Sequence, residues 1–181
     1  MRVRDTAIEG VKLIQPEVFE DHRGVYVELF DTEKYRAVCG DLEFVQDDVS
    51  VSRKHVLRGL HGDFETTKLV SVLHGTGYAL LADNREGSPT FKSWQAFTLD
   101  DRSRCQLLIP PGIGNSVVAL SDVLVYWYKQ TTHFVPGRQF TIRWDDPDWE
   151  FSWPIAKPIL SARDELGRYV DAAAEADPAA P

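Results

Sequence analysis

The fold class is indicated most clearly by one stretch of the chain, Val123-Leu124-Val125-Tyr126-Trp127-Tyr128-Lys129. It is rich in β-branched and aromatic residues, which favour strands. Because side chains alternate between the two faces of a strand, Tyr126 and Tyr128 share one face with Leu124, and Trp127 lies on the other. The stretch therefore predicts a strand with two phenols on one face, which serve either as core side chains with satisfied hydroxyls or as a proton donor.

Similar short segments recur along the chain and are separated by Gly, Pro, Asn and Asp. Eight further strands are predicted over residues 25–30, 44–51, 68–73, 77–83, 93–98, 106–109, 116–120 and 139–144. Helices are expected only over 32–38 and 161–170, where Ser161 can cap the second one. Close, regular spacing of strands is typical of a sandwich, jelly roll or barrel, so we predict one all-β domain over 1–170 and a flexible tail over 171–181.

Composition excludes several classes of protein. The 181 residues carry a formal net charge of −8, which argues against nucleic-acid binding by a basic surface. The acidity is uneven: residues 145–181 hold nine acidic and three basic side chains, whereas residues 50–70 have a net charge of +2, which leaves room for a small anionic ligand. No apolar run approaches the about 20 residues that span a bilayer, and no signal peptide is evident. With two distant cysteines, Cys39 and Cys105, we expect a soluble cytoplasmic protein with no disulfide framework and no membrane partner.

The densest group of chemically capable residues is Leu57-Arg58-Gly59-Leu60-His61-Gly62-Asp63. In a regular strand Arg58 and His61 would point to opposite faces. Gly59 and Gly62 favour a bulge that could turn both side chains inward. Taken alone, the group is equally consistent with a surface cation and a hydrogen-bonded edge histidine.

A second such group is Leu160-Ser161-Ala162-Arg163-Asp164 near the C-terminus. It places the Asp164 carboxylate in the first turn of a predicted helix. There Asp164 is either a simple capping residue or a functional carboxylate.

Taken together, these segments resemble the dTDP-4-dehydrorhamnose 3,5-epimerase family. The resemblance runs in order from about Ile14 to Asp164. It rests on Pro16-Glu17-Val18-Phe19-Glu20-Asp21-His22-Arg23-Gly24, Leu57-Arg58-Gly59-Leu60-His61, Lys68-Leu69-Val70, Ser88-Pro89-Thr90-Phe91, Ile109-Pro110-Pro111-Gly112, Tyr128-Lys129, Trp144-Asp145-Asp146-Pro147, Trp153-Pro154 and Leu160-Ser161-Ala162-Arg163-Asp164.

The resemblance implies a cupin-type jelly roll with short peripheral helices that acts as a homodimer on a nucleotide-linked 4-keto sugar, without metal or cofactor. It implies catalytic roles for four residues: a base, its orienting carboxylate, an acid on the opposite sugar face and a cation that stabilises the enolate, namely His61, Asp164, Tyr128 and Lys68. It also implies substrate contacts by Arg23 and Arg58, which would hold the diphosphate and nearby oxygens, and by Gln46, Asp48 and Asn115.

These residue types suit the chemistry that the resemblance implies. A proton next to a ketone is removable when fixed positive charge meets the developing enolate oxygen. A neutral imidazole is a suitable base near pH 7, and a carboxylate fixes its tautomer. Inversion needs a second group on the other face, where a protonated phenol can donate.

The sequence departs from the family pattern around the expected pocket. Asn115 stands where a histidine is common and Phe134 where a second tyrosine is common, while Gly137-Arg138-Gln139 lacks an acidic residue and Gln46-Asp47-Asp48 replaces Gln-Asp-Asn. Gly62-Asp63 and Gly114-Asn115-Ser116 resemble members proposed to act on GDP-linked 4-keto heptoses.

Three alternatives therefore stay open beside the dTDP-sugar epimerase: a GDP-4-keto-heptose epimerase, a 3,4-ketoisomerase and a non-catalytic sugar-binding β-domain. A metal-dependent dioxygenase of the same fold is disfavoured, because no His-x-His pair occurs in the chain.

Overall fold

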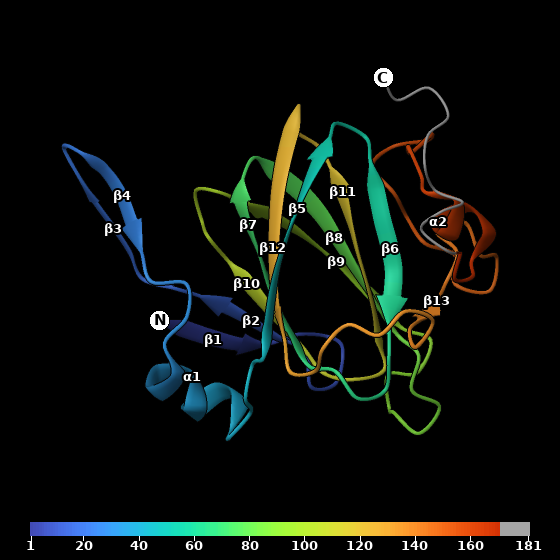
Figure 1. Ribbon diagram of the computed structural model, residues 1–181, viewed down its shortest axis with the longest axis horizontal. Helices are drawn as coiled ribbons and strands as arrows, with labels where there is room; N and C mark the ends of the chain where they lie inside the picture. The colour runs from blue at the N-terminus through green and yellow to red at the C-terminus, as the bar shows by residue number, and fades with distance from the viewer. Residues whose placement is uncertain (171–181) are drawn as a thin grey trace.

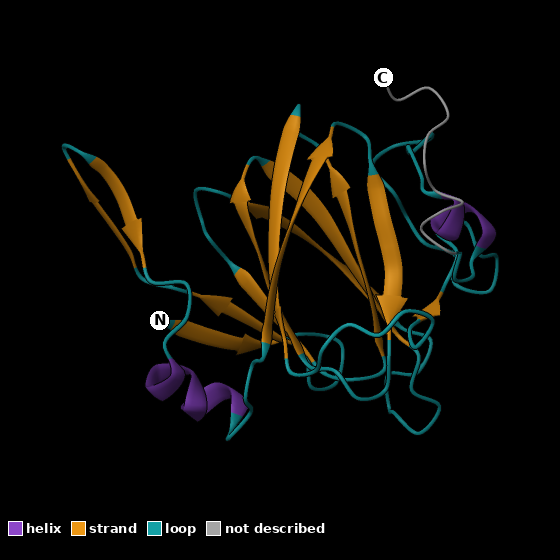
Figure 2. Cartoon of the chain, in the orientation of Figure 1, coloured by secondary structure: helices purple, strands orange, loops and turns teal. Residues whose placement is uncertain are grey.

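The computed structural model describes residues 1–170, and the tail expected over 171–181 lies outside them. Two packed β-sheets, a projecting hairpin and two short helices make up this part of the chain (Figures 1 and 2). The mostly β architecture predicted from the sequence is confirmed. No helix within residues 1–170 is long and apolar enough to cross a membrane.

The two sheets are antiparallel and interleave strands that are distant in sequence. The first has the order β1 (Arg2–Asp5), β2 (Lys12–Gln15), β10 (Gln106–Ile109), β7 (Lys68–His74), β12 (Val123–Gln130) and β5 (Gln46–Arg53). The second has the order β13 (Phe140–Thr141), β6 (Leu57–Gly62), β11 (Ile113–Ala119), β8 (Thr76–Asp83) and β9 (Trp94–Asp100). Successive strands such as β5 and β6, or β7 and β8, lie in different sheets, so residues from the whole chain face one another across the interior.

The main core lies between the sheets. Val70, Leu107 and Leu124 of the first sheet and Leu81 and Val117 of the second belong to one cluster of buried apolar side chains. Period-two alternation in β12 explains how this strand serves two layers: Leu124 and Tyr126 join the interior cluster, and Trp127 packs on the outer face. The two-faced strand predicted over 123–129 is confirmed.

Short segments cover the outer faces of both sheets. Helix α1 (Thr32–Cys39) begins at Asp31, whose side chain accepts a 2.8 Å hydrogen bond from Lys34 N, and it packs Tyr35 beside Trp127. On the other sheet, the aromatic side chains Trp149 and Phe151 cover the outer face. Helix α2 (Ala162–Leu166) follows, capped by Ser161 as predicted.

A two-stranded hairpin, β3 (Val18–Asp21) and β4 (Gly24–Val27), pairs with neither sheet. In Figure 1 it projects away from the sandwich on the side of α1. Its side chains Phe19, Val25 and Tyr26 are all more than half exposed. The hairpin therefore presents apolar surface that the rest of residues 1–170 does not cover.

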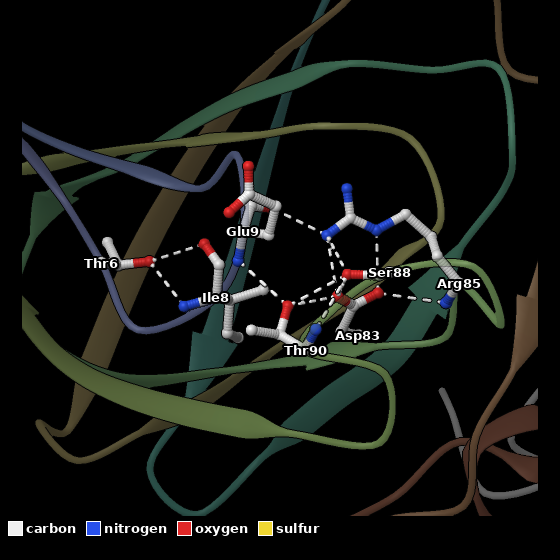
Figure 3. Close-up of polar contacts among 7 residues, drawn as sticks. All are labelled: Thr6, Ile8, Glu9, Asp83, Arg85, Ser88 and Thr90. Atoms are coloured by element: carbon white, nitrogen blue, oxygen red, sulfur yellow. Dashed lines mark hydrogen bonds and ion pairs between the residues drawn. The ribbon is translucent and has the colours of Figure 1, made fainter.

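The N-terminal segment is fastened to the sandwich by a buried carboxylate at the end of β8 (Figure 3). Asp83 accepts hydrogen bonds from Arg85 Nε (2.8 Å), Ser88 Oγ (2.6 Å) and Thr90 Oγ1 (2.6 Å). Arg85 and Thr90 in turn reach the backbone of Glu9, at 2.7 and 3.1 Å. This group, the Asp83 cluster, joins the 83–90 turn to the loop between β1 and β2.

Each of the nine predicted strands overlaps an observed one, but several bounds differ. The strand expected over 25–30 ends at Val27, and the one expected over 139–144 shortens to Phe140–Thr141. The strands β1, β2, β3 and β6 were not predicted. The first three have only four residues each, and two glycines interrupt the apolar pattern of β6. Helix α2 is shorter than the expected 161–170 because Gly167, at φ 66°, ends it.

Candidate active site

A cavity of about 350 Å³ lies between the two sheets. Residues from both sheets, from α2 and from the 131–139 loop line it: Gln46, Asp48, Ser50, Arg58, His61, Lys68, Asn115, Val117, Tyr126, Tyr128, Gln130, Phe134, Gln139, Ser161, Arg163 and Asp164. The structure thus brings eight of the nine residues predicted for the site into one cavity. A sugar-binding scaffold with these side chains dispersed would not show such convergence.

The bulge predicted from Gly59 and Gly62 brings His61 and Arg58 to the cavity together. The pairing of β6 with β11 shifts register between the His61 and Arg58 positions, and both side chains line the cavity. Gly59 has φ 115°, and a Cβ there would overlap the backbone oxygen of Asn115. Only glycine fits this close approach, so the bulge prediction is confirmed together with its cause.

His61 and Asp164 form a short hydrogen-bonded pair, with 2.6 Å between His61 Nε2 and Asp164 Oδ1. Burial lowers the pKa of His61, against the hydrogen bond and charge of Asp164, which raise it. His61 is therefore neutral near pH 7. Since the ionised carboxylate can only accept, the ring proton lies on Nε2 and leaves the Nδ1 lone pair as the basic site.

Lys68 is the first residue of strand β7 and is 7% exposed. Burial lowers the pKa of its ammonium, while the charges of Asp63 and Asp48 raise it. Among residues 1–170 its Nζ forms no hydrogen bond. A buried cation of this kind can accept a ligand oxygen that gains negative charge.

Tyr126 and Tyr128 project from the same face of β12, with ring centroids 6.3 Å apart. The Tyr126 hydroxyl donates to Asn115 Oδ1 at 3.4 Å, whereas the Tyr128 hydroxyl has no hydrogen-bond partner in the part of the chain that is described. Burial, followed by the charge of Asp48, raises the pKa of Tyr128. Tyr128 is therefore protonated at neutral pH and able to donate into the cavity.

Side chains of β5 and its neighbours form a hydrogen-bonded wall of the cavity. Asp48 Oδ2 accepts from Gln46 Nε2 at 2.7 Å and from Gln130 Nε2 at 2.9 Å. Gln46 Oε1 then accepts from the backbone N of Phe134 at 2.8 Å. Asp48 thus holds two amides in place, and Arg58 donates to Ser52 Oγ at 2.9 Å from across the cavity wall.

Arg23 is the one predicted site residue that lies outside the cavity. It sits in the turn of the projecting hairpin, pairs with Asp21 at 2.6 Å and is 79% exposed. Nothing within residues 1–170 brings it near His61 or Lys68 in this chain. A role for Arg23 at the site would require another copy of the chain to supply it.

Sequence reasoning assigned no site role to Gln130 or Arg163, although both line the cavity. Gln130 lines the cavity because side-chain alternation in β12 places it on the same face as Tyr128. The sequence pattern therefore could have identified it. Arg163 lines the cavity because α2 packs against β13. No local sequence pattern predicts this contact between distant residues.

Two packed antiparallel sheets enclose a cavity that holds a neutral histidine, a buried cation and a protonated phenol, groups that can carry out general acid–base chemistry on a small molecule. The protein-family model for dTDP-4-dehydrorhamnose 3,5-epimerase matches residues 5–171. The chain belongs to this family of isomerases, which epimerise a dTDP-linked 4-keto-6-deoxyhexose at C3 and C5, and the isomerase prediction is confirmed by that membership.

Relatives of known activity cover most of the chain. The dTDP-4-dehydrorhamnose 3,5-epimerase of Salmonella typhimurium is 36% identical over 96% of this chain and 97% of its own length. That of Neisseria gonorrhoeae is 40% identical over 93% of this chain, but this chain spans only 52% of it. The suggested GDP-heptose sub-group finds no support in these relatives.

A solved structure confirms the cupin-type fold. The crystal structure of the dTDP-6-deoxy-D-glucose-3,5-epimerase of Legionella pneumophila, in complex with dTDP-4-keto-L-rhamnose, superposes with a TM-score of 0.87 at 35% identity. The match covers 93% of this chain and 92% of that one.

Proposed function

We propose that this chain inverts carbons next to the keto group of a dTDP-linked 4-keto-6-deoxyhexose with His61 as base and Tyr128 as acid. His61 Nδ1 removes the proton from the carbon, the C–H electron pair becomes the C=C bond of an enolate, and the π pair of the carbonyl moves onto the keto oxygen. Lys68 stabilises that oxygen, and Tyr128 returns a proton to the same carbon from the opposite face. The 2.6 Å bond between His61 and Asp164 in the cavity is the observation that carries this assignment.

The direct test follows solvent deuterium into C3 and C5 of dTDP-4-keto-6-deoxyglucose. His61→Asn should lower the exchange rate by about 10²- to 10⁴-fold, because general base catalysis contributes about that much. His74→Asn is the matched control, since His74 also faces a carboxylate, Asp101 at 3.4 Å, but on the surface. Exchange that survives His61→Asn at the wild-type rate would refute the assignment.

Tyr128→Phe separates proton removal from proton return. Without the phenol, His61 can still remove a proton and return a deuteron on its own face, so exchange should persist while net inversion falls. Tyr78→Phe is the control, because the Tyr78 hydroxyl only donates to Ser152 O at 2.8 Å outside the cavity. Equal, small losses in exchange and inversion would assign Tyr128 a structural role instead.

Product analysis in the same experiment tests the remaining alternatives. A 3,4-ketoisomerase would move the carbonyl, and a non-catalytic sugar-binding domain would bind the substrate without exchange. Activity without a metal or cofactor stays a prediction, tested by assaying after exhaustive chelation. The cytoplasmic location likewise stays a prediction.

A homodimer is the assembly that the exposed hairpin supports. Phe19, Val25 and Tyr26 present apolar surface, and Arg23 at the hairpin turn could reach a cavity only in a partner. Mass measurement by light scattering should show a dimer. Arg23→Ala should weaken substrate binding, whereas Arg36→Ala, which removes another exposed ion-paired arginine (3.1 Å to Asp41), should not. A monomer with wild-type activity would refute the assembly.

A further inference from the structure

The segment that begins helix α2 presents three polar side chains to the cavity: Ser161, Arg163 and Asp164. The Ser161 hydroxyl donates to Asp164 Oδ2 at 2.9 Å, and its oxygen accepts from the Asp164 backbone N at 3.2 Å. Asp164 Oδ1 is already bonded to His61. Both oxygens of the carboxylate are therefore engaged, and its plane is fixed by one hydroxyl that also caps the helix.

Arg163 ties the same turn to the neighbouring sheet. Its Nε donates to Thr141 Oγ1 at 3.0 Å and its Nη1 to Gln139 Oε1 at 3.4 Å. Thr141, in β13, is the register partner of His61 in β6. The contacts close a ring in which Arg163 anchors α2 beside the strand that carries the base.

This ring matters because a base must be held close to its productive position. A displacement of about 1 Å can cost about 10²-fold in rate. We propose that Ser161 and Arg163 are positioning residues that hold the His61–Asp164 pair in one geometry. The proposal rests on the proposed function in taking His61 as the base, but the ring can be tested in the substrate-free protein.

The charged groups around His61 set the direction of the expected changes. Asp164 and Arg163 face it from α2 and Lys68 from β7, while its strand neighbours Asn115 and Thr141 are neutral. Burial, Arg163 and Lys68 lower the pKa of His61, and Asp164 raises it. The Ser161 hydroxyl donates to Asp164 Oδ2 and draws negative charge toward that oxygen. Its removal leaves more negative charge on Asp164 Oδ1, which faces His61, and should raise the pKa of the ring.

The first experiment compares Ser161→Ala with Ser161→Thr. The alanine variant should lower kcat by about 10- to 100-fold, the cost of a base that is misplaced by up to about 1 Å, with KM nearly unchanged. The acidic limb of the pH profile of kcat should move to higher pH. Ser161→Thr should restore both the wild-type kcat and the wild-type position of this limb. Ser121→Ala is the control, because Ser121 also bonds backbone groups in a turn, at 2.7 Å to Val123 O, away from the cavity.

Capping and orientation can be separated. Ser161→Asp retains a good helix cap but cannot donate to Asp164, so the protein should fold while the acidic limb still moves upward. A limb that stays at the wild-type pH in both Ser161→Ala and Ser161→Asp would overturn the role of Ser161.

Arg163 is tested by Arg163→Lys and Arg163→Met. Lysine keeps the charge but not the planar fork, so kcat should fall about 10-fold without movement of the limb. Arg163→Met should lower kcat and also move the acidic limb of its pH profile to higher pH, because the charge of Arg163 lowers the pKa of His61. Wild-type kcat in Arg163→Met would overturn the role of Arg163.

A spectroscopic measurement keeps this inference separate from the proposed function. Nitrogen-15 NMR of histidine in the substrate-free protein should show His61 protonated on Nε2, and a mixture of tautomers after Ser161→Ala. If His61→Asn left deuterium exchange intact, the proposed function would fail while this signature still tested the ring. An unchanged His61 tautomer in Ser161→Ala would refute the positioning role.

Discussion

Two buried carboxylates, Asp83 and Asp164, have been placed by the fold in opposite kinds of surroundings. Asp83 is fully buried and accepts hydrogen bonds from the fixed cation Arg85 and from two hydroxyls, all within the protein (Figure 3). Asp164 is almost as inaccessible but bonds the imidazole of His61, a group that can gain and lose a proton, and faces a cavity. The comparison shows that burial alone does not mark a catalytic carboxylate. Under the proposed function the difference lies in the partner, because His61 can gain and lose a proton whereas Arg85 stays charged.

The difference extends to stability. Burial raises the pKa of Asp83, but the hydrogen bonds from Arg85, Ser88 and Thr90 outweigh it and lower the value to about 2. Its interactions therefore favour the folded, ionised state. The Asp83 cluster stabilises the fold, and the His61–Asp164 pair is suited to proton transfer.

The largest effect expected is on activity. Asp164→Asn should lower the rate of deuterium exchange by about 10³-fold, because the amide no longer fixes the Nε2 tautomer or stabilises the imidazolium. The free energy of unfolding in urea should change by less than about 1 kcal/mol, because the amide oxygen of asparagine can still accept a hydrogen bond from His61 Nε2. A large loss of stability with normal exchange would reverse the roles assigned to the two carboxylates.

Asp83→Asn should lower the stability of the protein but leave its activity unchanged. Removing the carboxylate leaves Arg85 without its counter-charge and should destabilise the protein by about 3 kcal/mol in urea unfolding. Exchange per folded molecule should stay at the wild-type rate. Loss of exchange in the folded variant would show that the cluster also shapes the cavity.

The contribution of Asp83 to stability can also be measured in the wild-type protein, by lowering the pH. The pKa of Asp83 is about 2 in the folded protein, against the ordinary aspartate value of 3.8. A depressed pKa gives stability that is present above about pH 4 and is lost as pH falls to about 2, worth about 2 kcal/mol. Unfolding curves between pH 5 and pH 2 measure this loss, which should be much smaller in Asp83→Asn.

The smallest effect concerns a single hydroxyl. Ser88→Ala removes one of the donors to Asp83 and should cost about 1 kcal/mol, read from the urea midpoint. The exchange rate should not change. A cost as large as that of Asp83→Asn would mean that Ser88, rather than Arg85, is the main partner of the carboxylate.

Local patterns predicted much of the fold but little of the site. Alternation in 123–129 predicted the two faces of β12, and the two glycines predicted the bulge that turns Arg58 and His61 inward. The strand order and the packing of α2 on β13 depend on contacts between residues distant in sequence, which no local pattern contains. For that reason Arg163 was missed. Arg23 was expected at the site from the family resemblance, and it does not reach the cavity in its own chain.

The proposed base and acid stand on different sheets, since His61 belongs to β6 and Tyr128 to β12. Packed sheets lie about 10 Å apart, so under the proposed roles one of the two groups would face each side of a sugar ring bound between them. Under the proposed roles, the handedness of the product follows from this layered architecture. Inversion needs a proton-transfer group on each sheet, whereas a variant that keeps only His61, such as Tyr128→Phe, should return the proton to the face it left, with retention of configuration.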